Sequence, residues 1–411
     1  MNNKREDIDP DIVPVDGRGG PLGLMEPLLL EEGSRHRSRL MDLALELAQR
    51  SSGFRRSLPE KMVPALADLV RTMNCYYSNL IEGHATHPID IDRALKNQYS
   101  DNPEKRDLQI EARAHVAVQA WIDAGGVRGR FATVDAIREI HRRFCEELPD
   151  SLRWVEDPSG REKIRIEPGT FRHQNVVVGQ HVAVDWTSVQ RFMRRFEEVY
   201  SNLGKTETLL ASAAMHHRLV WIHPFLDGNG RVARLLSHAT FVEVLETGAI
   251  WSVARGLARQ VSNYKQHLAS CDLPRRNDLD GRGRLSEEAL AAFTEFFLKT
   301  CLDQVSFMEG LMDPSRLRIR VLRWAEEEIQ LGNLPRNASA VLEVALYRGE
   351  VLRADLARIV GTGERQARRV VSSLAERGVL VSEGPRAPLC LAFPMAIASR
   401  FFPGLFPDQP S

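Results

Sequence analysis

Apolar residues recur at helical spacing along most of this chain, and no other feature constrains its fold as strongly. Between His36 and Ser100 they follow one another at intervals of three and four, as in Leu66, Leu69, Val70, Met73, Tyr77, Leu80 and Ile81. Such spacing places apolar side chains on one face of an α-helix. The pattern returns over residues 184–203, 207–222, 231–247 and 257–269. We therefore predict an all-α fold for the body of the protein.

Two short β-rich runs interrupt the helical pattern. Lys163–Ile166 and Asn175–Val178 each lie between turn residues and are rich in β-branched side chains. Runs of this length and composition are typical of short strands. We predict a small hairpin among the helices.

Composition excludes several classes of protein. Lys plus Arg and Asp plus Glu number 55 each, so no global basic field attracts nucleic acid or an anionic membrane. The five cysteines are widely spaced and form no CxxC pair, which argues against a disulfide framework or a thiolate zinc site. No leader is recognisable, and no apolar stretch is long enough to span a bilayer. These features predict a cytoplasmic protein without a membrane segment.

The segment HPFLDGNGRVAR, from His223 to Arg234, combines a glycine-rich turn with the start of a helix. Gly228 and Gly230 flank Asn229, so backbone N–H groups, the Asn229 amide and the positive helix end can face one anion. Glycine permits close backbone approach and positive φ angles. The turn is therefore a candidate phosphate cradle.

Charged residues around the cradle suggest its chemistry. Arg231 and Arg234 can neutralise more than one phosphate, and Asp227 can bridge Mg²⁺ to phosphate oxygens. His223 has a pKa suited to taking a hydroxyl proton near neutrality. Each residue taken singly also has a structural interpretation: a buried histidine, a helix-capping aspartate, a C-cap glycine or surface arginines. Their order within twelve residues favours a site.

The same twelve residues resemble the signature of the Fic family, HxFxDGNGRxxR, at every specified position. The resemblance implies a helical core that transfers AMP from ATP to Ser, Thr or Tyr hydroxyls of proteins. His223 would be the base, Asp227 the ligand of Mg²⁺ or Mn²⁺, and Gly228, Asn229, Gly230, Arg231 and Arg234 the ATP-binding residues. Transfer of another nucleotide or of phosphocholine is an alternative within the same family.

The stretch from Pro168 to Gly179 resembles the Fic flap, whose edge pairs with the segment being modified. Main-chain pairing of this kind positions a hydroxyl without demanding one sequence. The residues expected to form this edge are Asn175, Val176, Val177 and Val178. The alternative is an ordinary hairpin that packs on the core.

Glu82 occupies an unfavourable position at the end of a predicted helix. A carboxylate in the last turn meets the negative end of the helix dipole, so a cation is expected to face it. The run Ser78–Gly83 is similar to the inhibitory motif [S/T]xxxE[G/N] of autoinhibited Fic proteins. This resemblance implies that Ser78, Glu82 and Gly83 form a brake in which Glu82 pairs with Arg234. We also hypothesise that Glu82 supports hydrolytic removal of AMP.

One family feature is only partly present. Fic proteins often carry an Asn-Arg-x-x-Tyr-Tyr run after the motif helix, where this chain has Gln260–Lys265. Tyr264 alone fits the pattern, as an ATP contact. A core aromatic is the alternative for this residue.

The last eighty residues change character. Three short helices followed by two strands around Gly384 indicate a winged helix-turn-helix. Arg365, Arg368 and Arg369 lie on its third helix and Arg386 near the wing, which suggests duplex DNA as a partner. Alternatives are a protein docking module or a homodimer contact. A DNA-binding transcription regulator with a nucleotide-sensing Fic core is the competing function.

A chain of 411 residues is expected to form two or three domains. We divide it into a flexible N-terminus (1–33), a helical region with the inhibitory helix (34–125), the Fic catalytic core (126–310), a helical connector (311–335), the winged helix-turn-helix (336–398) and a tail (399–411).

Overall fold

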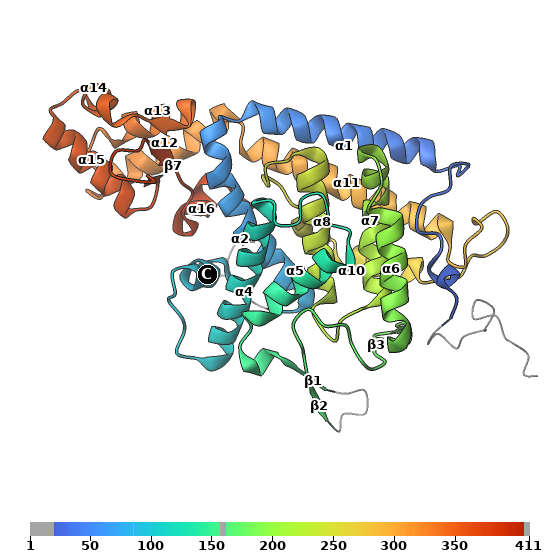
Figure 1. Ribbon diagram of the computed structural model, residues 1–411. Helices are drawn as coiled ribbons and strands as arrows, with labels where there is room; N and C mark the ends of the chain where they lie inside the picture. Colours follow the sequence, from blue (N-terminus) through green and yellow to red (C-terminus); the bar gives the residue numbers. More distant parts are fainter. Residues whose placement is uncertain (1–19, 85, 157–161, 407–411) are drawn as a thin grey trace, which may run out of the picture.

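The computed structural model describes residues 20–84, 86–156 and 162–406. Helices dominate this part of the chain, and the predicted all-α class is confirmed (Figure 1). Short 3-10 turns link several of the helices: Leu22–Met25, Glu60–Met62, Asp150–Leu152, Trp186–Ser188 and Arg353–Asp355.

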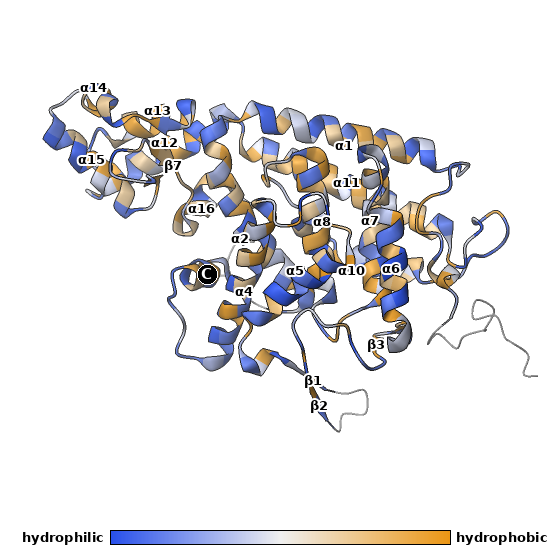
Figure 2. Cartoon of the chain, in the orientation of Figure 1, coloured by the Kyte–Doolittle hydropathy of each residue, from blue (hydrophilic) through white to orange (hydrophobic). Residues whose placement is uncertain are grey.

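Two neighbouring helices, α7 (Lys205–Ile222) and α8 (Asn229–Leu245), form the centre of the protein. Nearly every residue of α8 from Asn229 to Phe241 is buried, and Figure 2 shows the helix as largely apolar. The helix is therefore buried on all sides, and the polar residues near its start, such as Arg231 and Arg234, need partners within the core. The helices around this pair are α1 (Arg37–Ser57), α2 (Val63–Glu82), α4 (Pro103–Asp123), α5 (Val134–Glu146), α6 (Val189–Tyr200) and α11 (Glu287–Leu311).

Three shorter helices complete the body. α3 (Pro88–Leu95) packs on α4, while α9 (Val253–Arg259) and α10 (Val261–Cys271) pack on α11. The sequence predicted one helix over residues 257–269. The structure has two, because Gln260 leaves helical geometry between them, at φ −120° and ψ 36°.

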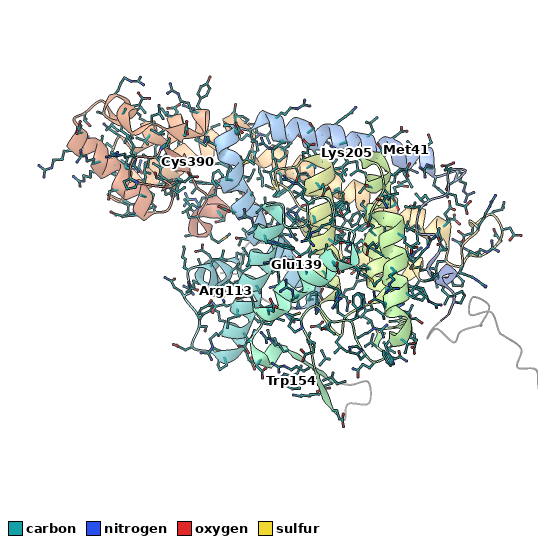
Figure 3. All side chains as sticks on the ribbon, in the orientation of Figure 1. Met41, Arg113, Glu139, Trp154, Lys205 and Cys390 are labelled. Atoms are coloured by element: carbon teal, nitrogen blue, oxygen red, sulfur yellow. The ribbon has the colours of Figure 1, made fainter. Side chains whose placement is uncertain are left out.

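The β-rich runs form two hairpins rather than one. Strand β2 (Lys163–Arg165) pairs with β1 (Trp154–Glu156), and β3 (Val177–Val178) pairs with β4 (His181–Val182). The first hairpin, which carries Trp154, projects from the helical body (Figure 3). Each predicted run therefore pairs with a segment close to it in the sequence, and the two runs do not pair with each other. In the second hairpin, Gly179 supplies the positive φ, 62°, that a two-residue turn requires.

The N-terminal segment differs from the expectation of a flexible region over residues 1–33. Met25, Leu28 and Leu30 are buried in the core. The Tyr200 hydroxyl also donates to the Leu28 carbonyl at 2.7 Å. The described part of this segment thus packs on the core through three apolar side chains, although they follow no helical periodicity. The domain boundary at residue 33 stays a prediction. Residues 1–19 lie outside the described residues.

The C-terminal unit follows a long helix, α12 (Pro314–Gln330). It contains α13 (Ala338–Arg348), α14 (Leu356–Val360), α15 (Glu364–Glu376) and a small antiparallel sheet in the order β5-β7-β6. The strands are β5 (Glu350–Val351), β6 (Leu380–Val381) and β7 (Leu389–Leu391), with Cys390 visible in this unit in Figure 3. The three predicted helices and two strands are present, and β5 is additional. The assignment as a winged helix-turn-helix stays a prediction.

The chain returns to the body through α16 (Met395–Phe401). Phe401, Phe402 and Leu405 are fully buried, and the Tyr77 hydroxyl on α2 donates to the Leu405 carbonyl at 3.0 Å. Within the described part of the chain, no helix is both long and apolar enough to cross a membrane.

Candidate active site

The HPFLDGNGRVAR segment forms a tight loop between the two central helices. Helix α7 ends at His223 in the left-handed conformation, at φ 50° and ψ 60°, and Gly228 precedes α8 at φ 80°. Asn229 closes the loop from inside: its Nδ2 donates to the Phe225 carbonyl at 2.8 Å, and its Oδ1 accepts from the Phe225 N–H at 2.9 Å. The Asn229 amide is thus engaged within the loop, which differs from its expected use as a phosphate donor.

His223 is held in one tautomer. Its Nδ1–H donates to the Val220 carbonyl at 3.3 Å, which leaves the lone pair on Nε2. Burial lowers the pKa of His223 from 6.5 to about 4, so the imidazole is neutral near pH 7. A neutral imidazole with its lone pair on Nε2 can take a proton from a hydroxyl group.

Arg234 points back toward α2 and meets the predicted inhibitory run. Its Nη2 pairs with Glu82 Oε1, and its Nε donates to Ser78 Oγ at 2.8 Å. Gly83 follows Glu82 at φ 86° and ends the helix. Burial alone would raise the pKa of Glu82, but Arg234 and Arg231 outweigh burial and lower it, so Glu82 is a carboxylate at neutral pH. The expected Glu82 to Arg234 contact is therefore present.

Arg231 has a carboxylate partner that the sequence reasoning missed. Its Nη2 pairs with Glu111 on α4, and both side chains are buried. His84 Nδ1 lies 2.7 Å from the other Glu111 oxygen, and this hydrogen bond raises the pKa of His84. Both motif arginines thus face a carboxylate from another helix. No local pattern marked Glu111, because it is one acidic residue on an otherwise ordinary helix.

Asp227 stands at the mouth of the cradle. Its carboxylate is 53 % exposed and lies 4.0 Å from Arg231 Nη1. Among the described residues, no three His, Cys, Asp or Glu side chains gather as a metal centre. A single exposed carboxylate beside the candidate phosphate cradle fits Mg²⁺, which is commonly bound through one or two carboxylates together with substrate phosphates.

His141 on α5 also belongs to the site, although no sequence pattern marked it. Its ring stacks on Phe225, with ring centroids 3.8 Å apart, and its Nε2–H donates to the Asp227 carbonyl at 3.2 Å. Its Nδ1 accepts from the Gly169 N–H at 2.9 Å. Burial lowers the pKa of His141 to about 4, which keeps the ring neutral in this bridging role. His141 therefore joins the loop of Asp227 to the start of the predicted flap.

The four predicted flap residues lie on or beside β3. Val177 and Val178 are 60 % and 45 % exposed, and Val176 extends the pairing through its carbonyl, which accepts from Ala183 N–H at 3.3 Å. Asn175 is used within the hairpin: its Nδ2 donates to Asp185 at 3.1 Å. An exposed apolar strand edge is a template for pairing with another chain.

Tyr264 lies in the core rather than on an exposed face. It is 3 % exposed, and its hydroxyl is 2.7 Å from His216 Nε2. Burial raises the pKa of Tyr264 to about 12, so it stays a neutral phenol. This placement favours the alternative of a core aromatic over the predicted ATP contact.

Comparisons with known proteins agree with this geometry. Residues 131–240 match the model of the Fic/DOC family. Proteins named protein adenylyltransferase Fic from Drosophila mojavensis and Drosophila yakuba are 30% and 32% identical over 164 residues. Each alignment covers 39% of this chain and 30% of the relative, so the chain spans less than a third of the length of these relatives.

A solved structure has a similar fold over almost the whole chain. It is a Fic family protein from Desulfovibrio desulfuricans, with a TM-score of 0.53 and 17% sequence identity. The alignment covers 89% of this chain and 98% of that one. The helical architecture described above is therefore shared with that protein.

Proposed function

We propose, because residues 131–240 match the model of the Fic/DOC family, that the protein is an adenylyltransferase. It moves AMP from ATP to a Ser, Thr or Tyr hydroxyl of a target protein and of itself. The observation that carries the proposal is the loop between α7 and α8. There, a neutral His223 with its lone pair on Nε2 stands beside a glycine turn and two arginines at the start of a helix.

The reaction is a substitution at the α-phosphorus of ATP. His223 Nε2 takes the proton of the target hydroxyl while the hydroxyl oxygen forms a new bond to the α-phosphorus. The bond between the α-phosphorus and the leaving pyrophosphate breaks. Arg231, Arg234 and the N–H groups at the start of α8 hold the phosphate oxygens. Asp227 would hold Mg²⁺, which supplies further charge neutralisation on the phosphates when it is bound.

We further propose that the protein rests in a restrained state. Arg234 pairs with Glu82, and the Cβ of an alanine at Gly230 would lie 2.5 Å from Glu82 Oε1. The Glu82 carboxylate therefore extends over the cradle, where a terminal phosphate of ATP would otherwise pair with Arg234. Hydrolytic removal of AMP from a modified target is the second role proposed for Glu82. Comparing AMP release by wild type and by Glu82→Gly tests that role.

The target is proposed to bind as an added strand on β3. The exposed edge at Val177 and Val178 supports this mode, because main-chain pairing gives alignment while leaving the target sequence open.

Mass spectrometry of Glu82→Gly protein incubated with Mg²⁺ and a mixture of nucleotides tests the proposed function. The expected product carries AMP on a hydroxyl side chain, and His223→Ala in the same background carries none. If the added group is not AMP, the donor is another nucleotide or a phosphocholine compound instead of ATP. Absence of any adduct on Glu82→Gly would contradict the transferase.

A second candidate function concerns the C-terminal unit. Arg365, Arg368 and Arg369 are all exposed on α15, which supports duplex DNA as a partner of a nucleotide-sensing regulator. Arg368 lies 3.3 Å from Glu364, however, which reduces the positive charge. A mobility shift of random-sequence duplex by the full chain, weakened by salt and by Arg365→Glu, would support this function. No shift at low salt would contradict it.

A further inference from the structure

The end of α7 leaves backbone carbonyls in need of donors, because the last four C=O groups of a helix have no partner within it. Here the helix ends directly before the proposed base. The Leu219 carbonyl accepts from the His223 N–H at 3.1 Å, and the Val220 carbonyl accepts from the His223 ring at 3.3 Å. His223 thus satisfies two of the four groups and is itself held by them.

The flap and the adjoining strand β4 supply donors for the remaining two carbonyls of α7 and for the two carbonyls that follow. His181 Nε2–H donates to Trp221 at 2.8 Å, and Arg172 Nη2 donates to Ile222 at 3.4 Å. Arg172 Nε donates to the His223 carbonyl at 2.8 Å, and its backbone N–H donates to the Pro224 carbonyl at 2.9 Å. Four consecutive carbonyls, from residue 221 to residue 224, therefore accept from Arg172 in the flap and His181 in β4.

The same Arg172 side chain also closes the base of the flap hairpin. Its Nη1 donates to the Gln174 carbonyl at 2.7 Å, and its Nη2 donates to the Val184 carbonyl. Residues 174 and 184 flank β3 and β4 on either side. Arg172 is 1 % exposed, and burial lowers its pKa to about 10, so the guanidinium remains charged. One buried cation thus joins both arms of the hairpin to the end of α7 and to His223, the proposed general base.

The geometry points to Arg172 as a positioning residue for AMP transfer. It holds the strand edge that aligns the target hydroxyl and the histidine that deprotonates it in one fixed relation. This inference rests on the proposed function, because it gives a purpose to the flap and to His223 in that reaction. Arg172 contacts neither of the motif arginines that would bind phosphate, so its action is on geometry rather than on ATP.

Arginine is required because its planar fork presents N–H donors in several directions at once. A lysine ammonium keeps the charge and can donate three hydrogen bonds, but from a single atom. It cannot reach Gln174 and Val184 on one side and Ile222 and His223 on the other. Arg172→Lys therefore keeps the positive charge and removes the shape of the guanidinium, so it tests the two requirements separately.

His181 forms a second, smaller attachment at the tip of the hairpin. Its Nδ1 lies 3.3 Å from Asp272 Oδ2, while its Nε2 donates to the Trp221 carbonyl. Burial lowers the pKa of His181, but its hydrogen bond with Asp272 outweighs burial and raises it. His217 on α7 donates to the other Asp272 oxygen at 2.9 Å. The tip of the flap is thus tied to α7 and to the residue after α10.

The test uses Arg172→Lys in the Glu82→Gly background, with the inert His223→Ala chain as acceptor at increasing concentration. We expect kcat to fall by about 100-fold and KM for the acceptor to rise, because a displacement of about 1 Å costs a factor of this size. KM for ATP should not change. Arg255→Lys is the matched control: Arg255 is also buried and donates to a carbonyl, that of Gly404 at 2.9 Å, away from the flap.

Hydrogen exchange supplies a readout that does not depend on activity. Arg172→Lys should speed exchange of the amides in residues 174–186 and leave α8 protected. If this variant does not fold, His181→Gln takes its place, and it should speed exchange of the same amides to a smaller extent. Unchanged exchange in the flap, or a fall in kcat with both KM values unchanged, would overturn the inference. Failure of the Glu82→Gly parent to transfer AMP would instead contradict the proposed function, while the exchange result would still decide the role of Arg172.

Discussion

At the scale of single residues, both arginines of the proposed phosphate cradle already pair with carboxylates of the protein. Arg234 faces Glu82, and Arg231 faces Glu111, with Asp227 4.0 Å from Arg231. The two pairs differ in burial: the Glu111 side chain is 1 % exposed and the Glu82 side chain 33 %. They are therefore expected to play different parts, the buried pair in folding and the more exposed pair in regulation.

Glu111→Gln should lower the free energy of unfolding by about 3 kcal/mol, because removing one partner leaves a buried charge uncompensated. Glu82→Gln should cost less, about 1–2 kcal/mol, because Ser78 still accepts a hydrogen bond from the buried Arg234 and the Glu82 side chain is itself 33 % exposed. Urea denaturation of the two variants measures the difference. Equal costs would contradict the division of roles.

The pH dependence of AMP transfer reports the state of His223. Because burial lowers its pKa from 6.5 to about 4, the base is lost only as the pH falls toward about 4. Transfer by Glu82→Gly should therefore stay level from pH 8 to about 5.5, with circular dichroism as the control for folding. An acid limb centred near the ordinary histidine value of 6.5 would contradict this assignment.

Sequence reasoning reached some of these residues and not others, for a physical reason. His223, Gly228 and Arg234 lie in one short segment, so their order alone predicted a site. Glu82 was marked by its place in the last turn of a helix, and the family resemblance named Arg234 as its partner. Glu111, His141 and Arg172 act through distant elements, and each contributes a single polar residue to an unremarkable helix or loop. Their roles arise only when folding brings those elements against the carbonyls and arginines of the loop.

At the scale of elements, the site is a junction between the end of one helix and the start of the next. Helical periodicity predicted α7 and α8 closely, because both helices are long. It could not assign the partners of the β-rich runs, since two- and three-residue strands carry no register information of their own. The junction itself depends on a left-handed residue at each end, His223 and Gly228.

Gly228→Ala tests the backbone of this junction. At φ 80° an alanine adopts the left-handed conformation, and we expect a loss of about 1–2 kcal/mol in the free energy of unfolding. Gly310→Ala is the matched control, because Gly310 lies within α11 with open space around the added methyl group. That change should stabilise the protein by about 0.5 kcal/mol. Destabilisation of similar size in both variants would contradict the conformational argument.

At the scale of the whole molecule, the C-terminal end packs on the helix that carries the proposed brake. Tyr77 on α2 immediately precedes Ser78, and it donates to the Leu405 carbonyl at 3.0 Å. Tyr76 contacts Phe406 edge to face, with ring centroids 5.6 Å apart. The far end of the chain is therefore in direct contact with the element that restrains Arg234.

Tyr77→Phe removes this hydrogen bond and keeps the ring. We expect the free energy of unfolding to fall by about 1 kcal/mol, the usual contribution of one buried hydrogen bond. Chemical denaturation of the full chain measures the change, and the leucine variant of the same residue should cost more through lost packing. A cost near zero for Tyr77→Phe would show that the Leu405 carbonyl finds another donor.

The central claim is that this loop is an AMP-transfer site restrained by Glu82. Incorporation of label from ATP carrying a radioactive α-phosphate into the protein itself tests it most directly, with wild type, Glu82→Gly and Glu82→Gly with His223→Ala compared side by side. The account predicts weak labelling of wild type, at least about tenfold more in Glu82→Gly, a gain that corresponds to about 1.4 kcal/mol, and none in the double variant. Equal labelling of wild type and Glu82→Gly, or label that persists without His223, would contradict it.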